Sequence, residues 1–269
     1  MNKTQIVSIC LVLLLSLSGC SSLTGLNPND QTKQEVLDKS ANTSENIASV
    51  QSSTSFNITT IPSEDNDTLY FRTNATQEID FEDKEYEQRG NSTSDLGFGD
   101  TTVSLEEYYK NGVYYSTEQN NNDNETWTQS EEPFSNAVGD SGITGFESFN
   151  DEFVDSLEME YNANTNEYVF TSNLENNESR MALFNQLDDS SVAFIQGGTE
   201  INQFVKNPDS GALRFTIDAD TYYLTSFNMD FVGSEPGDEQ IKKLDFRFTV
   251  EFSQHNNDVK VTVPEKAKE

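Results

Sequence analysis

The sequence has few cysteines, few basic side chains and one histidine, and each shortage argues against a class of protein. Both cysteines, Cys10 and Cys20, lie within the first twenty of 269 residues, so the rest of the chain has no thiol for a disulfide or a thiolate metal site. Lys and Arg total 16 against 47 Asp and Glu, a net charge of −31, and nucleic acid selects the opposite kind of surface. The lone His255 cannot form a histidine metal site by itself.

Motifs that carry catalysis or bind phosphate are also missing. Residues 139–142 (Gly-Asp-Ser-Gly) match the short sequence around a trypsin-like nucleophile, but the only base, His255, follows Ser141, the reverse of the trypsin order. The order Ser, Asp, His belongs with a parallel α/β sheet, whereas this sequence predicts antiparallel strands. No calcium loop, phosphate loop or His-Glu-x-x-His motif occurs. We therefore expect neither an enzyme, nor a cofactor, nor a dedicated metal site.

The first twenty residues resemble a lipoprotein signal peptide. Lys3 precedes an apolar run over residues 6–17, and the lipobox follows. We expect residues 1–19 to be removed, Cys20 to become the lipidated N-terminus, and residues 20–30 to form a tether. The alternatives are an ordinary secretory signal and an uncleaved anchor, for which the run is short against the ~20 residues of a membrane span. A diacylglycerol thioether supplies two acyl chains, so the expected partner of Cys20 is the outer face of the cytoplasmic membrane. The lipobox residues are Leu17, Ser18, Gly19 and Cys20.

The acidic residues are spread along the whole chain. Distributed carboxylates with few lysines are typical of proteins in high salt, which favours a halophilic archaeal source over an acidic surface protein from a moderate habitat. Seven Asn-x-Ser/Thr triplets are candidate N-glycosylation sites if the source organism glycosylates exported proteins. They begin at Asn42, Asn57, Asn66, Asn74, Asn91, Asn124 and Asn177.

The hydrophobic pattern changes twice along the chain. Residues 32–50 are predicted to form a helix, with Thr32 and Glu35 at capping-box spacing. A period of two follows, with an Asn111-Gly112 hairpin turn and a strand that begins at Trp127. Residues 133–158 have helical spacing interrupted by glycines, and residues 159–171 form a second hairpin. A short helix at residues 179–187 presents Met181, Phe184 and Leu187 on one face.

The C-terminal third has the clearest strand pattern. Residues 244–252 carry apolar side chains at five consecutive even positions. Tyr223 begins another alternating series with Thr225 in its polar place, and three alternate valines at residues 259–263 are predicted as a last strand. Strict alternation indicates one buried and one solvated face, hence an antiparallel sheet. About ten strands in one sheet must curl. The prediction is one α+β domain over residues 31–269, a strongly curved half-barrel sheet that wraps two or three helices.

This order of parts resembles the LolA/LppX/LprG-like half-barrel lipoproteins, especially archaeal and Gram-positive members. The resemblance depends on the lipobox, the central helices, the phrase at residues 108–115 followed by Trp127, the turn at residues 216–224 and the ending at residues 261–267. It implies a hydrophobic cavity, between the sheet and its helices, that carries acyl chains.

Two functions remain open at this point. The first is a lipid-anchored envelope protein, without enzymatic activity, that binds a lipid or other hydrophobic ligand in the half-barrel. The second is a structural or interaction lipoprotein with a solid core and no ligand. A contiguous void of ~300 Å3 or more would favour the first. The side chains expected to line it are Phe146, Phe153, Phe246 and Phe248.

Overall fold

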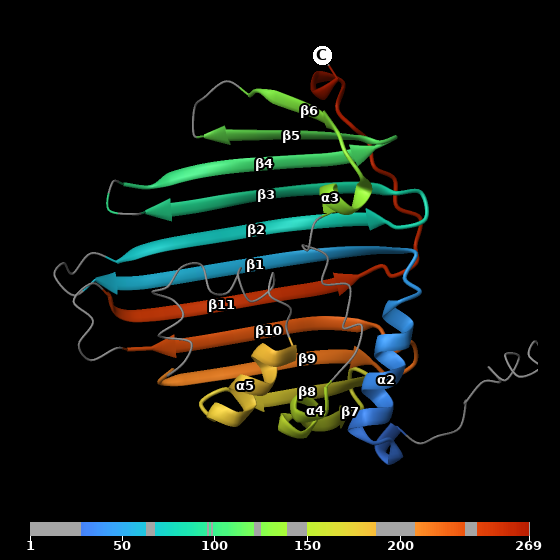
Figure 1. The fold of residues 1–269 in the computed structure, drawn as a ribbon, viewed down its shortest axis with the longest axis vertical. Helices are drawn as coiled ribbons and strands as arrows, with labels where there is room; N and C mark the ends of the chain where they lie inside the picture. Colours follow the sequence, from blue (N-terminus) through green and yellow to red (C-terminus); the bar gives the residue numbers. More distant parts are fainter. Residues whose placement is uncertain are drawn as a thin grey trace, which may run out of the picture. The chain divides into compact units, whose positions relative to one another are not determined.

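The computed structural model describes residues 28–62, 68–95, 97, 99–120, 125–138, 150–186, 208–234 and 241–268 (Figure 1). The chain divides into two units, residues 1–32 and residues 33–269. The described part of the first unit is a 3-10 turn at Pro28–Asp30. The lipobox and Cys20 lie outside the described residues, so the signal peptide and the lipid anchor stay predictions. Within the described ranges, no helix has both the length and the apolar character needed to cross a membrane.

The second unit is built on one sheet of eleven antiparallel strands in the order β6-β5-β4-β3-β2-β1-β11-β10-β9-β8-β7 (Figure 1). The strands are β1 (Ser49–Pro62), β2 (Leu69–Asp80), β3 (Glu85–Asp95), β4 (Thr101–Lys110), β5 (Val113–Asn120), β6 (Trp127–Glu131), β7 (Glu158–Asn162), β8 (Glu167–Asn173), β9 (Ser210–Asp218), β10 (Leu224–Gly233) and β11 (Ile241–Ser253).

Two meanders make up this sheet. β1 to β6 run outward in one direction and β11 to β7 in the other, and β1 pairs with β11 at the centre. The outermost strands are β6 and β7, so the sheet is open. The expected α+β class with an antiparallel sheet is confirmed. The described residues contain four α-helices, one more than the two or three expected: α2 (Lys33–Ser44), α3 (Phe134–Val138), α4 (Asp151–Ser156) and α5 (Asn177–Gln186).

The two faces of the sheet follow from strand alternation. Phe56 lies opposite Phe248, and the even residues of β1 and β11 share one face. The helices pack on this helix-side face, where Phe153 of α4 and Leu183 of α5 join the main hydrophobic core (Figure 1). We call the opposite side the back face. Local signals behave as expected: Asn111 and Gly112 have φ angles of 55° and 83°, as a type I′ turn requires.

The N-terminal helix is shorter than predicted. It ends at Ser44, and Val50 belongs to β1, where it lies opposite Ile79 and is buried. The helical spacing of the apolar residues was misleading because Ile47 and Val50 are buried in the same core through a turn and a strand. At the start of the helix, Val36 and Leu37 are buried as expected.

Two predicted apolar faces differ from the structure, the one in α5 at Met181 and the one in β10 only at its start, since Phe227, Met229 and Phe231 are buried as predicted. In α5, Met181 is 47% exposed and Ala182 and Leu183 are buried, because the helix is rotated relative to the predicted face; Leu187 lies outside the described residues. In β10, the register with β9 shifts between Leu224 and Ser226. This irregularity at Thr225 turns Leu224 into the core instead of Tyr223, so the predicted alternation breaks there.

The valines at residues 259–263 do not form a strand. The described segment 257–267, which we call the C-terminal strap, is extended without ladder pairing and ends in a 3-10 turn at Glu265–Ala267. Its buried residues form a separate cluster with Tyr108 on the back face, and Trp127 packs against that cluster. The alternate valines are buried as their pattern predicts, but they pack on the sheet instead of extending it. The buried strap residues are Val259, Val261, Val263 and Ala267.

Candidate functional site

A row of polar side chains crosses β1 to β5 on the helix-side face. Its members lie opposite one another in successive strand pairs, so the sequence places one on each strand at the same level of the sheet. We call this set the polar row. It consists of Ser52, Gln77, Gln88, Glu107 and Ser116.

Hydrogen bonds join most of the polar row. Ser52 donates to Gln77 Oε1 at 3.3 Å, and Gln77 Nε2 donates to Gln88 Oε1 at 2.5 Å. Ser52 and Gln77 are buried, with 9% and 7% of their surface exposed. Gln88, Glu107 and Ser116 are half-buried. Polar side chains that are only partly covered can hydrogen-bond to one another and remain accessible to a ligand.

Two tyrosine hydroxyls lie within hydrogen-bond distance of the carboxylate of Glu107. Tyr114 donates to Oε1 at 2.5 Å and Tyr86 lies 3.2 Å from Oε2. The same Tyr86 hydroxyl lies 2.9 Å from Gln88 Oε1. Burial, and then the negative charge or hydrogen bond of Glu107, raise the pKa of both tyrosines above the ordinary value. Both hydroxyls therefore keep their protons near neutral pH and act as donors.

The charge around Glu107 has one sign. The helix-side positions of β1 to β5 hold no Lys, Arg or His, and no basic side chain of the described part pairs with this carboxylate. Four of the five arginines lie instead on the back face, as their strand partners show. Glu118, on the helix-side face of β5, is exposed and adds negative charge. The four arginines are Arg72, Arg89, Arg214 and Arg247.

Partly exposed apolar residues lie on the same face as the polar row. Leu105 lies two residues from Glu107 on β4, and Val103 two residues further; both are half-buried. On β2, Phe71 is 39% exposed and its ring packs edge-on against Phe56 at 6.0 Å. Phe71 and Met181 are the exposed large hydrophobic residues of the described part. The surface of this half is therefore amphipathic, with hydrogen-bonding groups beside apolar ones.

Small residues lie between the polar row and Phe71. Gly90 is opposite Ala75 on β2 and Leu105 on β4. A Cβ at Gly90 would lie 2.9 Å from the carbonyl oxygen of Asn74 and 3.0 Å from the Cβ of Ala75. The close approach of β2 to β3 therefore favours glycine at this position.

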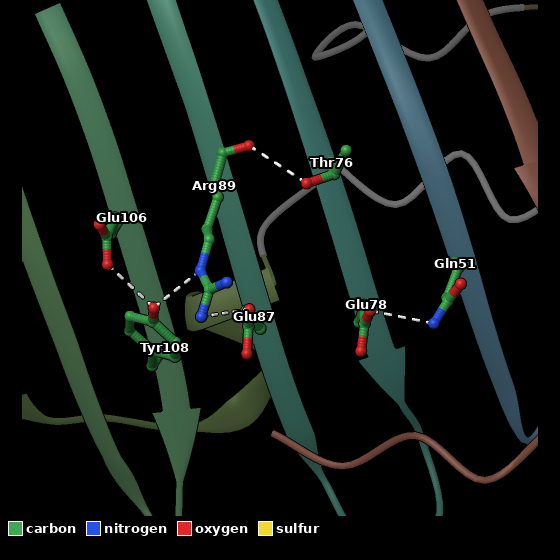
Figure 2. A network of polar contacts seen from close by, with 7 residues as sticks. All are labelled: Gln51, Thr76, Glu78, Glu87, Arg89, Glu106 and Tyr108. Carbon is green, nitrogen blue, oxygen red and sulfur yellow. Dashed lines mark hydrogen bonds and ion pairs between the residues drawn. The ribbon is translucent and has the colours of Figure 1, made fainter. Parts of the chain in front are cut away.

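A second polar network lies on the back face (Figure 2). Arg89 Nε donates to the hydroxyl of Tyr108 at 3.0 Å, and Tyr108 donates to Glu106 at 2.9 Å. Arg89 also pairs with Glu87 at 2.9 Å. Burial is the main cause that raises the pKa of Tyr108 to about 12. The one cation, Arg89, pairs with Glu87, while Glu106 accepts from the neutral Tyr108 hydroxyl, so each of these side chains has a partner within the chain, as in a structural contact.

The C-terminal strap is attached beside that network. Lys110 Nζ donates to the carbonyl of Val261 at 2.7 Å and pairs with Glu85 at 2.8 Å. At the far end, Gln129 donates to the carbonyl of Ala267 at 2.8 Å. The strap thus holds together strands that are distant from β11, and it covers Tyr108, which is fully buried.

Three of the four phenylalanines expected to line a cavity are brought together. Phe153, Phe246 and Phe248 belong to one core cluster, with exposed fractions of 0%, 0% and 9%. Asn150 positions Phe153 by capping α4, because its Oδ1 accepts the Phe153 backbone N–H at 2.8 Å. Phe146 lies outside the described residues. A cavity beside the other three stays a prediction.

The candidate glycosylation sites differ in the element that carries them and in their exposure. Asn42 on α2, Asn74 on β2, Asn91 on β3 and Asn177 on α5 are exposed, and Asn57 on β1 is half-buried. The three strand positions lie on the back face. Asn66 and Asn124 lie outside the described residues. Exposure permits modification at four positions, and their use stays a prediction.

The weak catalytic and metal candidates gain no support. Residues 139–142 lie outside the described part. His255 is half-buried in the turn after β11, where its ring stacks on Tyr223 at 4.4 Å, so it is less exposed than a simple turn histidine. Burial lowers its pKa. No group of His, Cys, Asp and Glu in the described ranges has the geometry of a metal site.

The polar row is not among the site residues predicted from the sequence. Gln77 has the same strand parity as the buried Ile79, and Glu107 the same parity as the buried Tyr109. Polar residues at core parity were the available signal. They were passed over because the apolar residues around them already fitted the strand pattern.

Comparisons with known proteins give a family and little more. Residues 32–269 match the family described as "Family of unknown function (DUF6612)". No protein of curated function matches the chain. Among solved structures, a DUF1329 family protein from Desulfovibrio piger ATCC 29098 is similar at 11% identity, over 85% of this chain and 94% of that one. Its TM-score of 0.19 is too low to support an argument about the fold. Because the family match covers most of the sequence, the chain belongs to the DUF6612 family.

Proposed function

We propose that this protein is a lipid-anchored envelope protein, without enzymatic activity, that binds an amphiphilic ligand on the helix-side face of its sheet. The anchor would be Cys20, held at the outer face of the cytoplasmic membrane, which the lipobox sequence supports. The sheet would be the half-barrel of the LolA/LppX/LprG-like lipoproteins. Eleven strands in one open sheet support a curved form, because sheets of that width twist or curl.

The amphipathic helix-side face carries the proposal. The β7 to β11 half of that face is mostly apolar and buried, whereas the β1 to β5 half has the polar row with Leu105 next to it and Phe71 further along the strands. A ligand with an apolar chain and a polar head matches both kinds of surface. Partial exposure of these side chains supports access. Ligand sites in proteins have this composition, mostly apolar with a few placed polar groups.

The test is native mass spectrometry of the full-length protein purified from membranes in a maltoside detergent. We expect a stoichiometric lipid mass on the wild type, released by organic extraction. Phe71→Asp should remove most of it, because a carboxylate replaces the exposed ring against which a chain would lie. Met181→Asp is the matched control: Met181 is 47% exposed on α5, the charge change is the same, and the lipid should stay.

The second candidate, an interaction lipoprotein with a solid core, is favoured by the packing of the C-terminal half. Phe153, Phe170 and Phe246 are fully buried in one cluster. A wild-type protein with no bound lipid in the mass spectrum, and none taken up from added lipid, would support this candidate and contradict ligand binding.

A further inference from the structure

Near Glu107 there are more hydrogen-bond acceptors than donors, so one acceptor lacks a donor. A tyrosine hydroxyl has one hydrogen, yet Tyr86 lies within hydrogen-bond distance of both Gln88 Oε1 and Glu107 Oε2. When Tyr86 donates to one of them, the other lacks that donor. Gln88 Oε1 has a second donor in Gln77, and Glu107 has its second donor, Tyr114, on the other oxygen. Glu107 Oε2 is therefore the atom most in need of a donor from outside the chain.

The negative charge near Glu107 favours a donor group that is positively charged. The carboxylate is half-buried, and the helix-side positions of β1 to β5 hold no basic side chain. Glu118 and the net charge of −31 add to the negative potential. A phosphate or carboxylate head would meet this charge without a counter-ion, which is unfavourable. A protonated amine brings both a positive charge and up to three N–H donors.

Three aromatic rings, of which Tyr86 and Tyr109 are buried, lie at the neighbouring level of the same face. Tyr86 is opposite Tyr109, and Tyr109 is opposite Tyr114, in the level of the sheet next to Glu107. Aromatic faces attract an ammonium group through their quadrupole. Tyr114 is half-buried, so part of it remains available.

From these contacts we propose that Glu107 binds the protonated primary amine of a cationic amphiphile, whose apolar chain lies over Leu105 and Val103. This inference rests on the proposed function and adds the chemical class of the head group. With a strand rise of ~3.4 Å per residue, Leu105 and Val103 lie about 7 Å and about 14 Å from Glu107 along β4. A six-carbon chain reaches Leu105, and a chain about twice that length is needed to reach Val103.

The experiment compares three probes with the same six-carbon tail. Hexylammonium, hexyl glucoside and hexyl phosphate are titrated calorimetrically, below their micelle concentrations, into the full-length protein in detergent-free nanodiscs, with empty nanodiscs as the baseline. We expect hexylammonium to bind about tenfold more tightly than hexyl glucoside, and hexyl phosphate to bind most weakly. Added salt should weaken the binding of hexylammonium alone, because only its head group is attracted by the negative charge, whereas the repulsion of hexyl phosphate is screened and hexyl glucoside is neutral.

Two variants separate recognition from folding. Glu107→Gln keeps an acceptor for the tyrosines and removes the charge, so hexylammonium should lose about tenfold in affinity and hexyl glucoside should change little. Glu106→Gln is the matched control, with the same charge change on the adjacent residue that faces the back of the sheet. It should leave all three affinities unchanged.

The outcomes distinguish this inference from the function on which it rests. Equal binding of hexylammonium and hexyl glucoside, or a Glu107→Gln variant that binds hexylammonium like the wild type, would overturn the amine site while amphiphile binding survives. Tightest binding of hexyl phosphate would overturn it in the same way. If no probe binds and no lipid copurifies, the proposed function fails as well.

Discussion

The two halves of the sheet share one architecture and differ in what their helix-side faces contain. In the β7 to β11 half, buried aromatic pairs such as Phe170 and Phe215, stacked at 4.8 Å, form a dense core under α4 and α5. In the β1 to β5 half, the same face carries the polar row, the glycine at residue 90 and the exposed Phe71.

The C-terminal half contains most of the hydrophobic core, and the N-terminal half carries the surface proposed to bind a ligand. Hydrophobic burial is the dominant favourable contribution to folding, and it is concentrated in the C-terminal half. The N-terminal half is stabilised in part from its other side, where the C-terminal strap covers Tyr108. Because part of the stabilising contact is on the back face, the helix-side face can carry partly exposed polar groups, which would be unfavourable if buried without partners.

The largest expected loss of stability is for a buried aromatic ring in the C-terminal half. Phe215→Ala should lower the free energy of unfolding by about 3–5 kcal/mol, the range for large aromatic deletions that leave a cavity. Phe71→Ala, on the other half, should cost under about 1 kcal/mol because that ring is partly in water already. Urea unfolding followed by circular dichroism measures both. Equal losses would mean that the halves do not differ in the way described.

The second largest expected loss of stability is for a change in the C-terminal strap. Val261→Ala removes two buried methyl groups and should cost about 2 kcal/mol. The only tryptophan, Trp127, packs against the strap cluster, so its fluorescence should report the loosening directly. An unchanged emission spectrum together with unchanged stability would show that the strap contributes nothing to the N-terminal half.

Gly90 tests how closely β2 and β3 approach. Replacement of glycine by alanine stabilises a protein where the backbone and the space allow it. Here the new Cβ would lie 2.9 Å from the Asn74 carbonyl oxygen, so Gly90→Ala should instead destabilise by about 1–2 kcal/mol. A rise in the unfolding midpoint would indicate that the strands separate easily at this point.

The smallest expected effect is a pH dependence at the end of β11. Burial lowers the pKa of His255, partly opposed by the charge of Asp218, and Nε2 is buried with no hydrogen-bond partner within the described ranges. The neutral imidazole is thus favoured by folding. Its contribution is complete above the unfolded pKa of ~6.5 and is lost as the pH falls from there toward the lowered folded pKa.

The check is the difference between two unfolding series. His255→Gln has no titrating group at this position, so its stability should fall less than that of the wild type between pH 7 and pH 5. Parallel curves for the two proteins would contradict the assignment of a lowered pKa to the buried ring.

Regular alternation and turn chemistry could be read from the sequence. The five even apolar residues of β11 are all buried, and Asn111-Gly112 makes the expected turn, because both features depend on local geometry alone. The strap shows the limit of this reasoning. Alternate valines indicate an extended segment with one buried side, whether it pairs with a strand or lies across one, and only tertiary packing decides between the two.

The candidate site was harder to predict for a related reason. Gln77, Gln88 and Glu107 are separated in sequence by eleven and nineteen residues, and only the strand register brings them into one row. Each residue alone looks like an ordinary polar position in a half-exposed strand. The alternation along the strands also places four of the five arginines on the other face, which composition cannot show.

The most direct test of the central claim is hydrogen–deuterium exchange of the full-length protein with and without saturating hexylammonium. Bound ligand on the helix-side face should slow exchange in β2 to β5 around Gln77, Gln88 and Glu107, and leave β8 to β10 unchanged because that half is already protected by its core. Protection confined to β8 to β10, or absent from the whole sheet while the probe is bound, would contradict the assignment of recognition to the N-terminal half.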